Sequence, residues 1–367
     1  MNNTTVYCPA CSKIVDSSKF KKIPPSTMDS LVQFDDLKII TCPNCHFSFA
    51  DQKVSDDDLE YFYSESYSGI AKKVGKNVHT IDLNDNWLNT RYLSQIELVR
   101  KYCELTPQTR VLEIGSGIGD LFRTLKYLGI HTNNYVIEPG IDAHPSLEKL
   151  AVKIFKKTLN YKSLAELPKN SYDLVIMSHS LEHFNAVDIY DILRGINNSL
   201  SEGGYFLCEV PNANLIEYPD ANDLVNPHLT FFTFKSIKQL LIKANFNIVF
   251  LNACGDKQLS KKPLSNEYLN RLKNKKYFDY KISVDGRVKI NIGYHNWLSQ
   301  KTRKNKLRVF VQNMVKKILS IAKLLSIVRK LRMQRVYDIL QDSNFIYSED
   351  REFIRVIAKK QECINKD

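Results

Sequence analysis

The loop that most constrains the fold of this chain reads Val111-Leu-Glu113-Ile-Gly115-Ser116-Gly117-Ile-Gly119. It joins a short apolar run to a helical pattern that begins at Asp120. Closely spaced glycines let the backbone turn sharply and approach a ligand closely. The loop therefore predicts a strand–turn–helix unit with a nucleotide-type site. A purely structural turn and a dinucleotide site remain alternatives, because nicotinamide and flavin enzymes use similar loops.

Strand and helix candidates alternate after Arg110. The predicted strands cover 111–114, 134–137, 152–155, 172–177, 205–210 and 246–251, with a seventh at 288–292. The predicted helices cover 120–128, 147–151, 187–200 and 234–244. This alternation predicts an α/β fold with a doubly wound, Rossmann-like parallel sheet. Residues 256–284, which are rich in Lys, Asn and Tyr, are interpreted as an insertion.

Two carboxylates further limit which nucleotide-type ligand the loop is expected to bind. Glu113 stands two positions before a Gly-x-Gly-x-Gly loop, which differs from the Gly-x-Gly-x-x-Gly order of pyrophosphate-binding loops. Glu138 ends the second predicted strand, where a carboxylate can accept both hydroxyls of a ribose. Together with segments 172–183 and 200–205, these features make residues 110–250 resemble the class I S-adenosylmethionine-dependent methyltransferase family.

The resemblance implies a seven-stranded sheet whose last strand is reversed, with S-adenosylmethionine along the carboxyl ends of strands one, two and four. The resemblance places the methionine part near Glu113, Gly115, Ser116 and Gly117, and the ribose near Glu138. It places the adenine near Ser163 and Leu164, and the sulfonium near Ser178 and His179. Ser163 departs from the acidic residue that is common at its position.

Methyl transfer to a hydroxyl gains from a general base, and His is the common choice near neutral pH. The candidates are His228, His183, His179 and Glu209. We favour His228, because it follows the fifth strand, where the resemblance implies an acceptor loop. The alternative for His183 is a structural role, in which it hydrogen-bonds the backbone and shapes its loop.

Two Cys-x-x-Cys pairs stand near the N-terminus, Cys8 with Cys11 and Cys42 with Cys45. Four thiolates in two close pairs suit a closed, structural zinc site. A redox-active pair is the alternative, but no thioredoxin-like pattern of strands and helices surrounds either pair.

These features divide the chain into four parts. Residues 1–52 are expected to form a zinc ribbon, 53–105 an aromatic and helical linker or lid, 106–300 the methyltransferase domain and 301–367 a basic helical tail. A zinc ribbon followed by a Tyr-rich segment (58–67) resembles sugar methyltransferases of cell-surface polysaccharide and deoxysugar pathways. Ribosomal-RNA methyltransferases with an N-terminal zinc motif are the second resemblance. Its residues Tyr61, Tyr63 and Tyr67 are candidates for a lid or a wall of the acceptor site, but aromatic residues at such spacing are more often plain core.

The net charge of +12 is concentrated in the tail, where residues 301–337 hold twelve Lys or Arg and no Asp or Glu. Residues 303–340 have an apolar stripe opposite basic residues, which is the composition expected of a segment that binds an anionic membrane surface. Packing of the apolar face on the protein itself and RNA binding are the alternatives. With no export signal in the sequence, we expect a cytoplasmic protein, peripheral at the inner membrane surface.

The sequence thus predicts methyl transfer from S-adenosylmethionine to a sugar, nucleotide-sugar or glycan acceptor. An RNA methyltransferase, which would grip RNA with the ribbon and the tail, is the second hypothesis. A non-catalytic binding module with the same fold is the third.

Overall fold

The computed structural model describes residues 6–22, 37–66, 87–88, 90–150, 152–155, 162, 164, 166–214, 228–255, 278–282, 288–292, 347, 349 and 351–361. Ser163, Tyr67 and the basic span 303–340 lie outside these residues. No helix of the described parts is long and apolar enough to cross a membrane.

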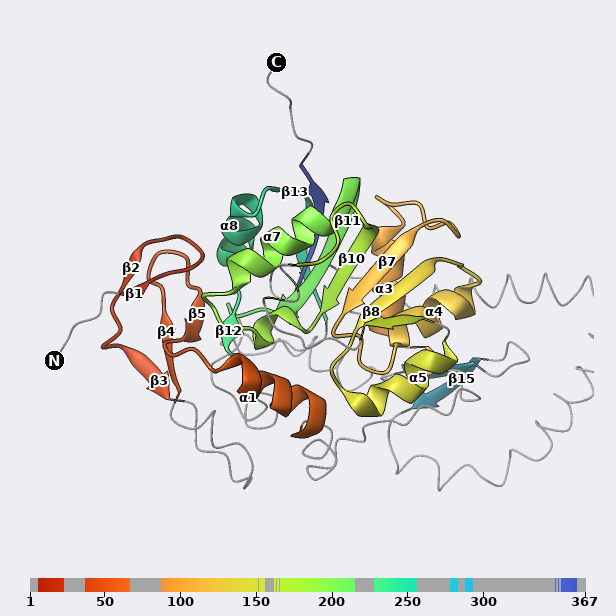
Figure 1. The fold of residues 1–367 in the computed structure, drawn as a ribbon, viewed down its shortest axis with the longest axis horizontal. Helices are drawn as coiled ribbons and strands as arrows, with labels where there is room; N and C mark the ends of the chain where they lie inside the picture. Colours follow the sequence, from red (N-terminus) through yellow and green to blue (C-terminus); the bar gives the residue numbers. More distant parts are fainter. Residues whose placement is uncertain are drawn as a thin grey trace, which may run out of the picture.

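A seven-stranded sheet forms the centre of the molecule (Figure 1). Its strands in spatial order are β13 (Phe246–Cys254), β16 (Phe353–Lys360), β11 (Leu200–Pro211), β10 (Tyr172–Ser178), β7 (Arg110–Ile114), β8 (Asn133–Ile137) and β9 (Lys153–Phe155). Neighbouring strands from β11 to β9 pair in parallel, whereas β16 is antiparallel to both β11 and β13. The expected α/β sheet with one reversed strand is therefore confirmed.

Side chains alternate between two cores, because successive residues of a strand point to opposite faces. In β7, Val111 belongs to one buried cluster and Leu112 to the other. The Val111 face is covered by α3 (Thr90–Val99), α4 (Asp120–Leu128) and α5 (His144–Lys149). The opposite face is covered by α7 (Ile189–Ser199) and α8 (Phe234–Lys243) (Figure 1). The sheet is thus doubly wound, and α3, from the predicted linker, packs in the domain core.

The segment predicted as the seventh strand, 288–292, is a strand, but its expected place in the central sheet is wrong. β15 (Val288–Ile292) pairs with β14 (Phe278–Ile282), which also pairs with β6 (Trp87–Leu88) in a separate sheet. The reversed strand of the central sheet is β16, within the predicted tail. Its five successive buried residues, 354–358, fill both cores, so this segment is part of the domain.

The N-terminal part is a small β module that is joined to the domain through a sheet. It contains β1 (Val6–Tyr7), β2 (Ile14–Val15), β3 (Phe20–Lys22), β4 (Lys38–Thr41) and β5 (Ser48–Ala50). β12 (Thr230–Phe231), which follows β11 in the chain, pairs with β5 and extends this sheet. The module continues into α1 (Asp56–Tyr61) and the π-helical turn η2 (Phe62–Ser66).

Candidate active site and cysteine cluster

The glycine loop lies at the carboxyl end of β7. Gly115 and Gly117 have φ values of +72° and +52°, a region that side chains other than glycine rarely adopt. A Cβ on Gly115 would lie 2.4 Å from Ser180 Oγ, whereas one on Gly117 would meet no described atom within 4 Å. The loop therefore packs tightly at its first glycine and leaves open space at its second.

Two buried carboxylates border this loop. Glu138 accepts hydrogen bonds from Gly117 N (2.6 Å) and Gly140 N (2.8 Å). Glu113 is 1% exposed, and its Oε2 makes no hydrogen bond to a described residue. Burial, and then the nearby Glu138, raise the pKa of Glu113 well above its usual value. An uncompensated buried carboxylate is costly, so Glu113 is prepared for a cationic or hydrogen-bond-donating ligand.

The other predicted cofactor residues are placed as follows. Ser116 is buried within the loop, and Ser178 Oγ accepts a hydrogen bond of 2.8 Å from Gln95 in α3. Leu164 is fully buried in a core cluster. Ser163 lies outside the described residues. Of this set, Glu113, Gly115, Ser116, Gly117, Glu138 and Ser178 gather at the carboxyl ends of β7, β8 and β10.

His179 takes part in a buried ionic network. Its Nε2 lies 3.2 Å from Glu209 Oε1, and its Nδ1 lies 3.5 Å from Glu182 Oε1. Arg355, from β16, is fully buried and forms an ion pair with Glu209. Burial and Arg91 oppose protonation of His179, yet its hydrogen bonds with Glu182 and Glu209 raise its pKa. The network fastens β16 and β11 to the end of β10.

His183 and His228 lie side by side at a second position. Their ring centroids are 5.0 Å apart, and the ring of Tyr63 from η2 lies 5.5 Å from that of His183. Glu182 is 1% exposed; burial opposes its ionisation, but His179, His183 and His228 lower its pKa to about 2. The main-chain oxygen of Tyr63 lies 3.8 Å from the position of a Cβ on Gly140. Tyr63 therefore connects the His183–His228 pair with the Glu138 turn.

The segment that carries His228 is fixed from two sides. Leu229 N donates to the main-chain oxygen of Glu182 at 2.9 Å, in the 3-10 turn η4 (Leu181–His183). On the other side, Ala50 N donates to Leu229 O at 2.9 Å. The N-terminal module and the methyltransferase fold thus jointly hold His228.

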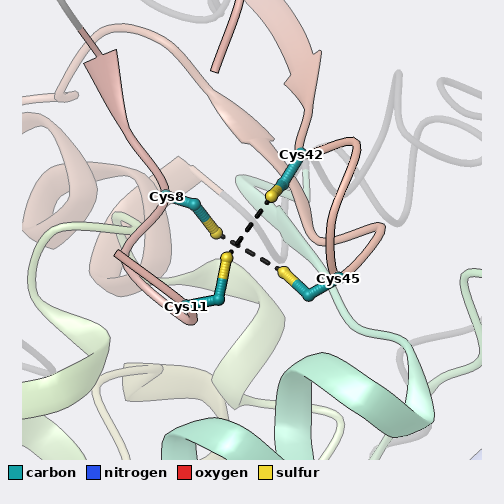
Figure 2. Close-up of side chains that lie close together, drawn as sticks. All are labelled: Cys8, Cys11, Cys42 and Cys45. Atoms are coloured by element: carbon teal, nitrogen blue, oxygen red, sulfur yellow. Dashed lines mark hydrogen bonds between the residues drawn. The ribbon is translucent and has the colours of Figure 1, made fainter. Parts of the chain in front are cut away.

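The four cysteines of the Cys-x-x-Cys pairs come together, as Figure 2 shows. Cys8 Sγ lies 3.5 Å from Cys45 Sγ, and Cys11 Sγ lies 3.5 Å from Cys42 Sγ. A disulfide would need about 2.05 Å, and all four cysteines are free thiols. The hydrogen bond from Cys8 lowers the pKa of Cys45 to about 5. The cluster brings four sulfur atoms close enough together that they could hold one metal ion.

Sequence reasoning missed three residues of the site. Arg355 was assigned to the tail, although a single Arg between Ile354 and Val356 is a signal for a buried ion pair. Gln95 lies in the predicted linker. Glu182 lies in the segment 172–183, which carries the family resemblance, but no role was predicted for it. Nothing local indicated that Gln95 or Glu182 would contact the site.

Comparisons with known proteins agree with this geometry. Residues 83–251 match the family model described as the methyltransferase domain. No curated protein matches the chain.

Among solved structures, the chain is similar to a SAM-dependent methyltransferase from Archaeoglobus fulgidus, with 17% identity, a TM-score of 0.41, and coverage of 74% of this chain and 94% of that one. It is similar to a possible histamine N-methyltransferase from Thermotoga maritima, with 17% identity, a TM-score of 0.39, and coverage of 74% and 89%. It is also similar to phosphoethanolamine N-methyltransferase 2 from Haemonchus contortus, with 13% identity, a TM-score of 0.43, and coverage of 86% and 62%. TM-scores of this size carry no conclusion about substrate.

The family match covers the glycine loop, Glu138 and the parallel strands β7, β8, β9, β10 and β11 of the central sheet. Residues 83–251 therefore form a methyltransferase domain, and the chain is a methyltransferase that uses S-adenosylmethionine.

Proposed function

We propose that this enzyme methylates a hydroxyl or a carbon of a sugar, a nucleotide sugar or a glycan. The observation that carries the proposal is the position of the His183–His228 pair, which Tyr63 connects to the Glu138 turn. Imidazoles and a tyrosine ring beside the methyl donor suit an acceptor that presents hydroxyl groups. The order of cysteine module, Tyr-rich segment and catalytic domain supports the same acceptor class.

The residues in and around the glycine loop fit S-adenosylmethionine. Glu113 offers a buried, unengaged carboxylate oxygen to the ammonium group of the methionine part. Gly115, Ser116 and Gly117 provide close backbone approach, with open space at Gly117. Glu138, which already orients Gly117 and Gly140, would hold the ribose hydroxyls. Ser178 and His179 would line the sulfonium side, and Ser163 and Leu164 the adenine side.

We also propose that Cys8, Cys11, Cys42 and Cys45 hold a structural zinc ion. Zinc–sulfur bonds of about 2.3 Å in a tetrahedron separate the sulfurs by about 3.8 Å. The observed pairs at 3.5 Å are close to this spacing. Four thiolates leave no coordination position for water, so this ion supports the module and takes no part in the reaction.

A methyl-transfer screen tests the acceptor class. The purified chain is incubated with labelled S-adenosylmethionine and nucleotide sugars, glycans or RNA, and the products are read by mass spectrometry. Methylated sugar or glycan is the expected product. Methylated RNA, together with an RNA affinity that falls steeply with salt, would contradict the proposal and support the RNA methyltransferase hypothesis. Failure to bind S-adenosylmethionine would favour a non-catalytic module.

His228 provides a sharper test of the acceptor side. His228→Ala should keep cofactor affinity and lose most of the turnover, because His228 lies beside His183 on the proposed acceptor side. His131→Ala, at an exposed position, is the matched control. Turnover of His228→Ala that equals the control removes His228 from the acceptor side.

We propose that the basic span 303–340 binds an anionic membrane surface, which would place the enzyme at the inner face of the membrane. Deleting everything after residue 300 is not a usable test, because it removes β16 from the central sheet. Replacing basic residues of 303–340 by Gln leaves the sheet complete. The substituted chain should no longer co-sediment with anionic liposomes, while the unaltered chain should.

A further inference from the structure

We propose that Glu182, His183 and His228 form a second metal site, which binds a divalent cation on the acceptor side. One ligand atom from each residue lies within 4.8 Å of the other two. An ion with bonds of about 2.1 Å holds its ligand atoms at most about 4 Å apart. Small side-chain rotations therefore suffice to bring the three atoms onto one ion.

The chemistry of the three ligands differs from that of the cysteine cluster. Two imidazoles and one carboxylate form a ligand set that catalytic sites use, in which a position stays open for water or substrate. Imidazole and carboxylate also accept Mn²⁺ and other harder cations, whereas thiolates select softer ones. The two clusters are thus suited to different roles in the same chain.

The main chain holds the three residues together before any ion binds. Glu182 and His183 are neighbours in η4, and Leu229, next to His228, donates its N–H to Glu182 O at 2.9 Å. Thr230 Oγ1 approaches the same oxygen at 3.3 Å. These bonds join η4 to the His228 segment, so binding an ion requires no rearrangement of the backbone.

A further residue supports the ligand carboxylate. His179 Nδ1 lies 3.5 Å from Glu182 Oε1, and His179 Nε2 lies 3.2 Å from Glu209 Oε1. Outer contacts of this kind fix the orientation of a ligand carboxylate and tune the affinity for the metal. His179 is therefore a positioning residue for Glu182, and β11 and β16 support it through Glu209.

In the proposed reaction, and only if the acceptor is a hydroxyl, the cation binds the acceptor oxygen and lowers the pKa of its O–H group. The proton passes to solvent. The oxygen lone pair forms the bond to the methyl carbon, the carbon–sulfur bond breaks, and its electron pair remains on sulfur. In this mechanism His183 and His228 hold the cation that activates the acceptor, and they do not take the proton of the acceptor themselves.

Direct titration of the full chain tests the site without cofactor or acceptor. Zinc-replete protein is titrated with Mn²⁺, followed by electron paramagnetic resonance and calorimetry, and separately with Zn²⁺. We expect one additional cation per chain with at least one of the two metals. Glu182→Gln and His228→Gln should each weaken binding at least about tenfold, as losses around metal sites do. His131→Gln, at an exposed position, should bind as the unaltered chain does.

Circular dichroism of each variant shows whether it folds, and His228→Gln keeps the test valid if Glu182→Gln does not. The site is refuted if neither metal binds the unaltered chain, or if all variants bind equally. Because binding is measured without an acceptor, the cation site can be confirmed even when the sugar screen fails. That combination would overturn the acceptor class alone.

Discussion

Thr233 donates a hydrogen bond from its Oγ1 to the main-chain oxygen of Cys45 over a distance of 2.8 Å. The same side chain caps α8, where it accepts from Ser236 N. Cys45 belongs to the cysteine cluster. Thr233 follows β12 by two residues, and β12 in turn begins two residues after His228. One hydrogen bond therefore ties the cysteine module to the segment that positions His228.

The first prediction concerns this tie. Thr233→Val removes the cap and leaves the buried Cys45 oxygen without its donor, so the free energy of unfolding should fall by about 1–3 kcal/mol. Urea unfolding at constant zinc concentration measures the change. Ser236→Ala disturbs the capping box without touching Cys45 and should release zinc to a chelator as slowly as the unaltered chain. Equally slow release from Thr233→Val would contradict the role of the tie.

A second prediction separates the two sides of the active site. Cys42→Ser should lose zinc and most methyl transfer but change cofactor affinity little, because the glycine loop and Glu138 belong to the central sheet. Cys103→Ser, outside the cluster, should retain one zinc per chain. Metal analysis and separate measurement of cofactor binding and turnover check both variants. Equal loss of cofactor affinity and turnover would argue against this separation.

The parts of the site that local patterns encode could be predicted. The glycine loop and Glu138 lie within 30 residues of each other, and β7 and β8 have the expected bounds to within one residue. The contact between His183 and His228 could not be predicted, because it depends on the η4 turn and β12 packing together. No periodicity of the sequence reports such a distant pairing.

The reversed strand was missed for a physical reason. β16 follows the long basic run and contains Arg355, Lys359 and Lys360, so its charge resembles that of the tail. Arg355 becomes compatible with a core only through Glu209, which lies 146 residues earlier. The local sequence shows the charge of Arg355 but gives no indication of the residue that compensates it.

A third prediction follows from the raised pKa of Glu113. A carboxyl whose pKa is raised on folding adds stability below its unfolded pKa and loses it as the pH rises through the folded value. Above the unfolded pKa, folding must therefore either bury this carboxylate or protonate it, and this cost destabilises the cofactor-free protein at neutral pH. Glu113→Gln should raise the melting temperature at pH 7 and weaken S-adenosylmethionine binding. Melting curves from pH 4 to pH 8 should show the gain growing with pH.

The matched control for that variant is Glu97→Gln, on the partly exposed face of α3. It should leave both the melting temperature and cofactor affinity nearly unchanged. If Glu113→Gln lowers the melting temperature at pH 7, the carboxylate is compensated in the cofactor-free protein, and the argument from its burial is wrong.

The fourth prediction compares two glycines of one loop. Gly115→Ala forces a Cβ to within 2.4 Å of Ser180 Oγ at a φ of +72°, whereas Gly117→Ala meets open space at +52°. Both substitutions strain the backbone by about 1–2 kcal/mol, but only Gly115→Ala adds a clash. Gly115→Ala should therefore lower stability more, as measured by urea unfolding. Gly117→Ala should affect mainly cofactor binding, because its Cβ enters the open space beside the loop, where we propose that the cofactor lies.

The fifth prediction tests the ion pair that joins β16 to β11. Arg355 and Glu209 are both fully buried, so removing Arg355 leaves the Glu209 carboxylate in the core with only Arg91, at 3.5 Å, and His179, at 3.2 Å, to compensate its charge. Arg355→Leu should lower the free energy of unfolding by about 3–5 kcal/mol. Arg355→Leu combined with Glu209→Leu should cost less than the sum of the single changes, because neither charge then remains. A double-mutant cycle by urea unfolding measures this coupling. Additive costs would mean that Arg355 stabilises the sheet through Ser94 and Tyr347, its other hydrogen-bond partners, and not through Glu209.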